Sequence, residues 1–581
     1  MKKIKFLLNK LIIQIKENKW IHYGIIIVIG VILSIPMCNI EIRDTHDGAL
    51  HLLRIIGTND TLQIGQIPPL INQNYCMGLG YSMNLFYPPL VTYIPLLIKL
   101  IVPTFSIALK VFAGLAIIFS GITMYKFVYT VTNKRSIALF ASIFYLIAPY
   151  KLANVYKRFA IGEFTALAFL PIVFMGLYNL FNQDGKKHYY IAIGAIGLML
   201  SHTVTTLYTA IFCIIYILFN ISKLKDKTII KKCVINVIFI LLVSMLFWAP
   251  LLEASKSATY AILNDDSMRT TPEYTAQNVI NFSQLFTDKQ EKNGTTFLIG
   301  IPTLIAIALT IFTYKKVDKK YKEFYIIAFL FSLISILMCT KFFPWIVMPN
   351  IICKLQYPWR MVGFFNFFIS FICGVNLYII LKTILKKDNI RLIISIILVL
   401  IMVIDSISIM TRFNSKRPEI DKKYENEILD NRKITHKQIN RDYMSIRSLY
   451  VQNTYVMERT DTTYVLKGNA EILNENKQNL TDIMDVKNVH KNTILEFPYL
   501  YYPGYEITIE KNNGEINKLK VVESEYGYAS CEINEDIDEA IIKIQYVGTL
   551  VTYISYSISL LTTVIFIIYI YKEKKKGKEN V

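Results

Sequence analysis

IHYGIIIVIGVILSIPMCNI, at residues 21–40, runs directly into EIRDTHDGALHLLR, at residues 41–54. The first stretch matches the ~20 apolar residues that an α-helix needs to cross a bilayer. It has no small-residue cleavage site, so we interpret it as an uncleaved membrane span and not as a signal peptide. The second stretch is rich in charged residues, which predicts that the chain leaves the membrane at residue 41.

The same change from apolar to polar sequence recurs along all 581 residues. Hydrophobic residues make up 53% of the chain, and charged residues make up 18%, below the ~25% usual for soluble domains. The mean hydropathy of +0.39 excludes a string of soluble domains and a disordered chain. The apolar runs predict a polytopic α-helical membrane protein with about twelve spans, at residues 21–40, 105–129, 137–150, 164–181, 189–201, 204–220, 233–251, 296–314, 324–340, 360–381, 392–411 and 548–571.

The net charge of +20 follows a positive-inside pattern. About 29 Lys and Arg residues fall in seven short segments that the twelve-span topology puts in the cytoplasm together with both termini. The short outer loops hold about 13 Lys and Arg in roughly twice the length. Because the basic residues alternate with spans in this way, we attribute the charge to membrane orientation and exclude a nucleic-acid partner.

These spans divide the chain into five parts. We predict a cytoplasmic basic amphipathic segment (1–20), a transmembrane domain (21–411) whose first outer loop is 41–103, an extracytoplasmic domain (412–547), a last transmembrane helix (548–571) and a basic cytoplasmic tail (572–581). Within the first outer loop, Leu90 to Val102 is apolar but too short to cross. The outer domain begins with a charged, helical stretch and continues with period-2 runs, which predict a mainly-β sandwich.

Charged and imidazole side chains are concentrated just after the first span. If residues 44–54 form one helix, Asp44, Asp47, His51 and Arg54 lie on one face of it, at offsets 0, 3, 7 and 10. A carboxylate and a histidine there suit a general base or a divalent metal site, with Mg²⁺ or Mn²⁺ at Asp44, Asp47 and His51. An arginine on the same face suits a phosphate. The alternative interpretation is a solvated, salt-bridged helix face.

Three further motifs place ionisable residues beside predicted spans. Tyr156-Lys-Arg158-Phe-Ala-Ile-Gly-Glu163 puts Arg158 and Glu163 on the outer face against the positive-inside trend, as a phosphate site or as an interfacial ion pair. His202 lies at the turn between two short spans, as a functional or a structural histidine. Gln356-Tyr-Pro-Trp-Arg360 opens a span from outside, as a phosphate site or as an interfacial anchor.

Common enzyme signatures are missing from the sequence. It contains no GxxxxGK[ST] nucleotide-binding loop, no HExxH metalloprotease motif and no GxSxG nucleophile motif. We therefore expect any chemistry to use a donor that needs no ATPase domain.

The motifs, taken in order, resemble a family of bacterial membrane proteins labelled "6-pyruvoyl-tetrahydropterin synthase-related". The resemblance covers nearly the whole chain. It rests on Asp47-x3-His51-x2-Arg54, Gly78-Leu-Gly-Tyr81 with Phe86-Tyr-Pro-Pro-Leu90, Arg158-x4-Glu163 with Pro171, Ser201-His202, Gln356-Tyr-Pro-Trp-Arg360 and Tyr501-Tyr-Pro-Gly-Tyr505. The pterin part of the label implies nothing for this chain, because the zinc-binding histidines of a soluble pterin synthase are missing.

That family is similar in architecture to GT-C glycosyltransferases, which take a sugar from a polyprenyl-phosphate carrier. The resemblance implies a catalytic role for Asp47, Asp44 and His51 and a donor-phosphate site formed by Arg54, Arg158 and Arg360. We expect supporting roles for Tyr156, Glu163, His202 and Gln356. GT-C enzymes often have a second outer carboxylate, for which Glu163, Asp265 and Asp266 all remain open.

We therefore expect a glycosyltransferase of the bacterial plasma membrane that transfers a sugar from a polyprenyl-phosphate donor to an envelope glycan or protein acceptor. Besides a divalent cation, no cofactor is expected. Two alternatives remain: a transporter or flippase of lipid-linked glycans, and a non-catalytic protein of cell-envelope assembly.

Overall fold

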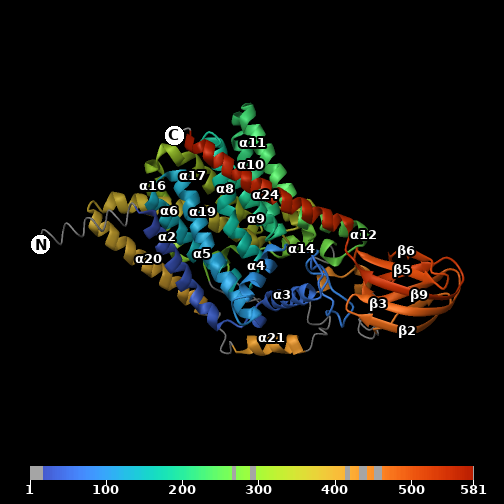
Figure 1. Ribbon diagram of the computed structural model, residues 1–581. Coiled ribbons are helices and arrows are strands. Elements are labelled where there is room, and N and C mark those ends of the chain that lie inside the picture. The colour runs from blue at the N-terminus through green and yellow to red at the C-terminus, as the bar shows by residue number, and fades with distance from the viewer. Residues whose placement is uncertain are drawn as a thin grey trace.

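The computed structural model describes residues 18–264, 270–287, 296–411, 419–430, 441–450 and 461–579. It consists of a large helical bundle with a C-terminal β domain at one end (Figure 1). Residues 1–17 of the predicted basic segment 1–20 lie outside the described residues.

Seven described helical stretches are long and apolar enough to cross a membrane: α2 (Lys19–Ser34) continued by the 3-10 helix η1 (Ile35–Asn39), α5 (Phe105–Thr132), α8 (Ile161–Asn182), α17 (Lys319–Cys339), α19 (Met361–Ile384), α20 (Asp388–Met410) and α24 (Leu550–Glu579). Two bent pairs raise the number to nine if each is one span. They are α6 (Arg135–Ile147) with α7 (Pro149–Tyr156), bent by 46°, and α11 (Lys227–Val243) with α12 (Met245–Ser257), bent by 66°.

Both bends have a local cause. Pro149 stands at the first position of α7, where its fixed φ begins a new helix and its missing N–H costs nothing. At the α11–α12 break, Ser559 of α24 accepts a hydrogen bond from Leu246 N at 2.8 Å and donates to Leu242 O at 3.1 Å. A side chain thus satisfies backbone groups that the bend leaves unpaired.

Twelve spans are not confirmed. The predicted span 189–201 is the ten-residue helix α9 (Tyr190–Met199), and 204–220 is the 17-residue helix α10 (Thr203–Phe219). The predicted span 296–314 is divided between α15 (Ile301–Ala308) and α16 (Thr310–Thr313). Within the described part of the chain, the count of seven to nine is the one that helix length and composition support.

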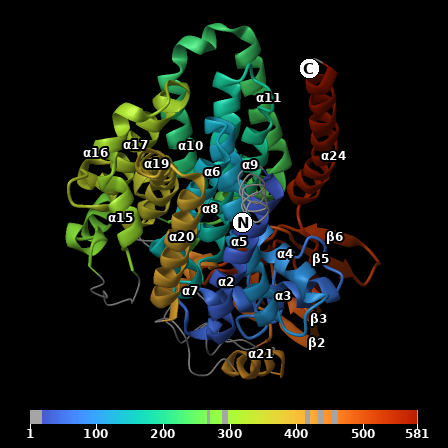
Figure 2. The same cartoon turned by 90° about the vertical axis from the view of Figure 1, so that its left-hand side faces the viewer.

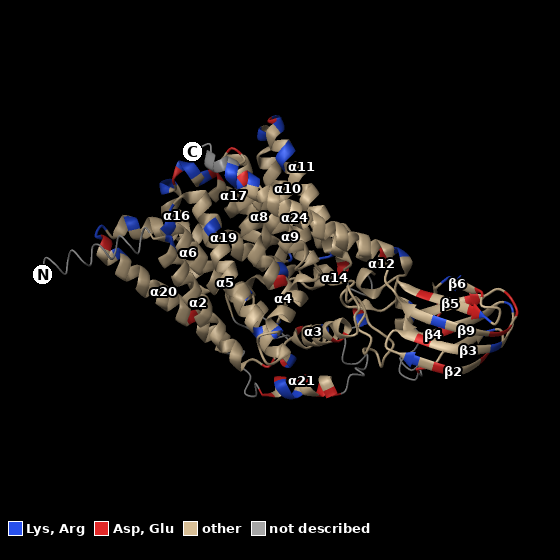
Figure 3. Ribbon diagram, in the orientation of Figure 1, with Lys and Arg blue, Asp and Glu red and all other residues tan. Residues whose placement is uncertain are grey.

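Basic residues gather at one end of the bundle. Figure 3 shows them at the ends of α11, α16, α17 and α24, away from the β domain. From the positive-inside rule we expect that end on the cytoplasmic side and the β domain on the outer side.

The first outer loop is mostly helical. It contains the short 3-10 helix η2 (Ile42–Asp44), followed by α3 (Gly48–Gln63) and α4 (Leu90–Lys99). Helix α4, at ten residues, is too short to cross, as predicted for this stretch. Short helices elsewhere connect the longer ones: η3 (Ile221–Lys225), η4 (Ala261–Leu263), α14 (Pro272–Gln277), η5 (Phe282–Leu285), η6 (Tyr314–Lys316), η7 (Trp345–Val347), α18 (Asn350–Cys353) and η8 (Pro358–Arg360).

The outer domain has a helical part and a β part. The helical part includes α21 (Ile420–Asp430), η10 (Arg441–Tyr443) and α22 (Ile446–Tyr450). The β part has two antiparallel sheets, ordered β1-β4-β8-β7 and β2-β3-β9-β5-β6. The strands are β1 (Tyr464–Lys467), β2 (Glu471–Gln478), β3 (Thr481–Val489), β4 (Thr493–Leu500), β5 (Tyr505–Lys511), β6 (Ile516–Leu519), β7 (Val522–Glu523), β8 (Tyr528–Ile533) and β9 (Ile537–Tyr546). The predicted C-terminal β domain is confirmed.

Candidate functional site

A pocket of about 570 Å³ lies where the outer ends of several helices meet the first outer loop and the outer domain. Seven of the ten predicted site residues line it: Asp47, His51, Arg158, Glu163, His202, Gln356 and Arg360. They come from four separate parts of the sequence, so the fold brings together motifs that the sequence only suggested were related.

Asp47 is held in place by its backbone while its side chain stays unpaired. The backbone N–H groups of His46 and Asp47 donate to the carbonyl oxygens of Lys157 (3.2 Å) and Arg158 (2.9 Å). Asp47 occupies the N-cap of α3, but its side chain makes no capping hydrogen bond. Within the described ranges, no residue forms a hydrogen bond or ion pair with its carboxylate.

Burial raises the pKa of Asp47, and the nearby Arg158 and Arg360 guanidinium groups oppose that shift. An unpaired carboxylate with a raised pKa, facing a pocket, is suited to accept a proton from a bound hydroxyl group.

Two arginines share one carboxylate on the other side of the pocket. Arg158 Nη1 lies 2.8 Å from Glu163 Oε2, and Arg360 Nε lies 3.7 Å from the same oxygen. Glu163 Oε1 accepts hydrogen bonds from Tyr150 (2.7 Å) and Asn154 (2.9 Å). Because one glutamate faces two guanidinium groups, the cluster keeps one excess positive charge.

Aromatic rings fix both guanidinium groups. The Arg158 guanidinium lies 4.5 Å from the centre of the Trp359 ring, and that of Arg360 lies 5.3 Å from the Tyr357 ring. Arg360 Nη1 donates to Leu355 O at 2.9 Å, while its buried Nε has no hydrogen-bond partner in the described structure. A partly unsatisfied guanidinium group, in a cluster where two arginines share one glutamate, is suited to bind an anion.

The two pocket histidines differ in their bonding. His202 Nδ1 accepts a hydrogen bond from Thr205 N at 3.2 Å, which assigns the proton of a neutral ring to Nε2. The His51 ring packs edge-on against Tyr87, with centroids 5.5 Å apart. Burial, followed by the nearby Arg54 charge, lowers the pKa of His51 to about 3, so the ring is neutral at pH 7.

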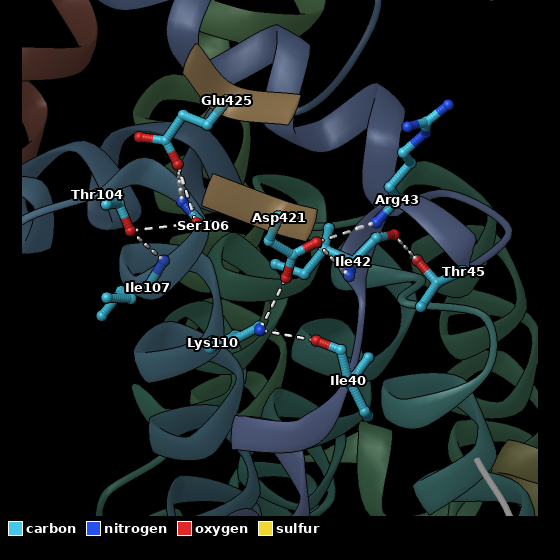
Figure 4. Close-up of polar contacts among 10 residues, drawn as sticks. All are labelled: Ile40, Ile42, Arg43, Thr45, Thr104, Ser106, Ile107, Lys110, Asp421 and Glu425. Carbon is cyan, nitrogen blue, oxygen red and sulfur yellow. Dashed lines mark hydrogen bonds and ion pairs between the residues drawn. The ribbon is translucent and has the colours of Figure 1, made fainter. Parts of the chain in front are cut away.

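Helix α21 fastens the chain just before Asp47, as Figure 4 shows. Asp421 accepts a hydrogen bond from Ile42 N at 2.8 Å and forms an ion pair with Lys110 at 2.8 Å. One turn later, Glu425 accepts from Phe105 N (2.8 Å) and Ser106 N (3.0 Å), at the N-terminus of α5. We name Asp421, Glu425 and Lys110 the α21 clasp. Because carboxylates at a helix N-terminus satisfy its unpaired N–H groups, the clasp ties the outer domain to the first loop.

Three predicted site residues lie away from the pocket. The prediction that Asp44 shares a helix face with Asp47 is wrong, because Asp44 ends the separate 3-10 helix η2, after which the backbone is extended at Thr45. Arg54 is buried and donates to Asn84 Oδ1 (3.0 Å) and to the carbonyl oxygens of Tyr87 and Pro88. Tyr156 is buried and donates its hydroxyl hydrogen bond to the carbonyl of Leu33. The last two support the loop and the first span.

The side chains in the pocket do not fit a divalent metal. Among the described residues, no group of three or more His, Cys, Asp and Glu lies close enough to hold one. Asp47 and His51 supply two donors, Asp44 lies elsewhere, and the Glu163 oxygens already accept hydrogen bonds. The positive charges of the two nearby guanidinium groups also disfavour binding of a metal cation. The Mg²⁺ or Mn²⁺ site stays a prediction that this arrangement does not support, and Asp265 and Asp266 lie outside the described residues.

The pocket also has lining residues that were not predicted, among them two from the outer domain. Asp442 and Tyr443 reach the pocket from η10 of the outer domain. The Tyr443 ring stacks on Phe86 with centroids 5.8 Å apart, and its carbonyl accepts from Tyr502 Oη at 2.9 Å. Asp442 and Tyr443 could not be predicted from the sequence, because both stand in a short polar stretch without a motif.

Residues 85–413 match the family described as "6-pyruvoyl-tetrahydropterin synthase related domain; membrane protein". The chain belongs to this family. Of the seven predicted residues that line the pocket, five lie inside the matched region: Arg158, Glu163, His202, Gln356 and Arg360.

A relative from Lactococcus lactis subsp. cremoris, named only "Uncharacterized protein", is 30% identical over 344 residues. The match covers 57% of this chain and 55% of the relative, so the chain spans about half the length of the relative that it matches. The printed name assigns no activity to that protein.

Proposed function

We propose that this protein is a glycosyltransferase of the GT-C type in the bacterial plasma membrane. It transfers a sugar from a polyprenyl-phosphate donor to a cell-envelope acceptor, a glycan or a protein, on the outer side. The observation that carries the proposal is the pocket itself: an unpaired carboxylate, Asp47, faces the same cavity as the Arg158 and Arg360 guanidinium groups.

The proposed reaction uses both sides of the pocket. An acceptor hydroxyl gives its proton to the Asp47 carboxylate while its oxygen bonds to the anomeric carbon of the donor sugar. The bond from that carbon to the phosphate oxygen breaks in line, and polyprenyl phosphate leaves with the bonding electron pair. Arg158 and Arg360 stabilise the negative charge that develops on the phosphate. Each of these steps is assigned to side chains that line the pocket.

Other lining residues suit the sugar and the acceptor. The side chains of Trp359, Tyr357 and Phe86 add apolar surface to the pocket lining, and His202 Nε2 offers a hydrogen-bond donor. Asp442 and Tyr443 bring the outer domain to the pocket, which supports a role for that domain in acceptor binding.

The test is donor turnover by the purified protein in detergent. A panel of polyprenyl-phosphate sugars is supplied with a mixture of envelope glycans, and free polyprenyl phosphate is measured with and without Mg²⁺ or Mn²⁺. We expect release by the wild type with at least one donor, and a loss of about 100-fold or more in Asp47→Asn, because a general base contributes that much.

The matched control is Asp44→Asn, which removes a carboxylate from the same loop at an exposed position outside the pocket. It should retain wild-type release. Full activity in Asp47→Asn, or an equal loss in Asp44→Asn, would contradict the role of Asp47. No release with any donor by folded protein would favour transport of lipid-linked glycans or a non-catalytic role in envelope assembly.

A further inference from the structure

A second cavity, of about 1010 Å³, lies at the opposite, basic end of the bundle. It is bounded by α2, α6 and α20, and Figure 2 shows α20 beside α2. None of the pocket residues of the candidate site lines it, so this cavity is separate from the one proposed for catalysis.

The cavity is apolar along most of its length. Its walls include Ile25, Val28 and Ile32 of α2, Leu139 of α6, and Ile396 and Leu400 of α20. From Ile21 to Ile32, the wall formed by α2 extends about 16 Å at 1.5 Å per residue. That is about half of the ~30 Å hydrocarbon core, which is the depth of one leaflet.

One end of the cavity is cationic. Lys134 and Arg135 follow the end of α5, Arg391 lies in the first turn of α20, and no aspartate or glutamate is among the lining residues. Arg391 forms an ion pair with Asp388 at 3.0 Å, and the Arg135 guanidinium lies 4.9 Å from the Tyr129 ring centre. Lys134 is exposed at this end. The positive-inside rule assigns this end to the cytoplasmic side.

We propose that this cavity, the α2–α20 groove, binds one anionic phospholipid of the cytoplasmic leaflet. Its phosphate lies against Lys134, Arg135 and Arg391, and one acyl chain lies between α2 and α20. Charge complementarity selects the head group, because the three cations at the opening outnumber the one nearby carboxylate, that of Asp388. The apolar walls favour a lipid over a soluble anion, because an acyl chain would cover them and an anion alone would not.

The first test measures head-group preference. The purified protein is exchanged into detergent with equal amounts of phosphatidylglycerol and phosphatidylcholine of the same chain length, and bound lipids are counted by native mass spectrometry. We expect one retained phosphatidylglycerol per protein. The triple variant Lys134→Gln, Arg135→Gln, Arg391→Gln should lose about fivefold in preference per cation, or about 100-fold together.

The charge control is the triple variant Lys315→Gln, Lys316→Gln, Lys320→Gln. It removes the same charge from exposed positions at the same end of the bundle, outside the groove. Retained preference in this control and loss in the groove variant support the proposal. Equal binding of the two lipids to the wild type, or equal losses in both triple variants, would overturn it.

The second test fills the groove without touching its charges. Gly24 lines the cavity, and a Cβ added there meets no atom within 4 Å, so Gly24→Trp puts its ring into open space. We expect this variant to lose the bound phosphatidylglycerol. The control, Val31→Trp, places the same ring on α2 at a position that is 47% exposed and outside the groove. Retention of the lipid by Gly24→Trp would show that the acyl chain does not lie there.

Discussion

Glu163 holds two arginines that the proposed reaction needs for its leaving group, which makes Glu163→Gln an informative perturbation. The side chain is 4% exposed and has Arg158 Nη1 at 2.8 Å and Arg360 Nε at 3.7 Å. Glutamine keeps an acceptor for Tyr150 and Asn154 but removes the negative charge. Two consequences of opposite sign follow: the folded protein loses stability, and the pocket gains affinity for anions.

Both magnitudes follow from the geometry. Removing one partner of a buried ion pair costs about 3–5 kcal/mol, and the retained hydrogen bonds favour the lower end. For a phosphate seated against the two guanidinium groups, we take a separation of about 6 Å from Glu163 as the basis of the estimate. At an effective dielectric constant of about 20, the repulsion that the substitution removes is about 3 kcal/mol, or about 100-fold in affinity.

The assay is thermal unfolding in detergent, followed by intrinsic fluorescence, with inorganic phosphate titrated at constant ionic strength. We expect Glu163→Gln to unfold at a lower temperature than the wild type without phosphate. As phosphate is added, the unfolding temperature of Glu163→Gln should rise by more than that of the wild type, because a ligand that binds the folded protein stabilises it by mass action. The control is Glu427→Gln, which removes an exposed carboxylate of α21. A phosphate response in Glu163→Gln no larger than in the wild type, or the same response in Glu427→Gln, would refute the anion site.

Three further predictions concern other parts of the site. Asp421→Asn and Lys110→Met should each destabilise the protein, because each leaves one buried charge without its partner. The double variant leaves no unpaired charge, so a double-mutant cycle should show a coupling energy of about 1 kcal/mol or more. Additivity of the two single effects within about 0.5 kcal/mol would contradict the clasp. The pKa of His51 is lowered to about 3 in the folded protein. Between pH 6.5 and pH 3, the unfolded chain therefore binds a proton at His51 while the folded protein does not. The free energy of unfolding of the wild type should fall by up to about 1.4 kcal/mol per pH unit as the pH is lowered through this range. His51→Gln removes this contribution, and a wild-type-minus-variant stability difference that stays constant from pH 7 to pH 5 would count against it. Arg158→Lys should lower polyprenyl-phosphate release at least about tenfold, because lysine cannot form the planar contact with Trp359 while it pairs with Glu163; unchanged release would rule out that role.

The sequence predicted the pocket best where a charge stood in apolar surroundings. Arg158, Glu163, His202 and Arg360 all border predicted spans, where an ionisable side chain needs a partner or a function. The structure joins Arg158, Glu163 and Arg360 in one cluster. The ion pair that was the alternative interpretation of Arg158 and Glu163 is therefore present, and it lies in the wall of the pocket.

Local periodicity also worked for the outer domain. Among the period-2 runs of the outer domain, Glu506–Glu510 and Ile541–Tyr546 fall within β5 and β9, where burial alternates along the strand. A strand with one buried face has a period of two, which is visible in a single sequence.

The failures arise where hydropathy and spacing carry no information about continuity. Hydropathy does not show whether an apolar run forms one continuous helix. The run 296–314 therefore predicted a span, although the structure divides it between α15 and α16. In the same way, the offsets from Asp44 to Arg54 imply one face only if one helix covers both ends. The extended backbone at Thr45 separates η2 from α3 and puts Asp44 out of phase.

Asp442 and Tyr443 show a further limit, since they stand about 400 residues along the chain from Asp47. Their place in the pocket depends on how the outer domain sits on the first loop. Asp421 bonds to the backbone at Ile42, and Leu500 N donates to Leu79 O at 2.8 Å. Since these contacts hold the same loop that carries Asp47, the outer domain forms part of the pocket wall and also fixes the position of Asp47. Changes at the clasp should therefore affect the pocket even though no clasp residue lines it.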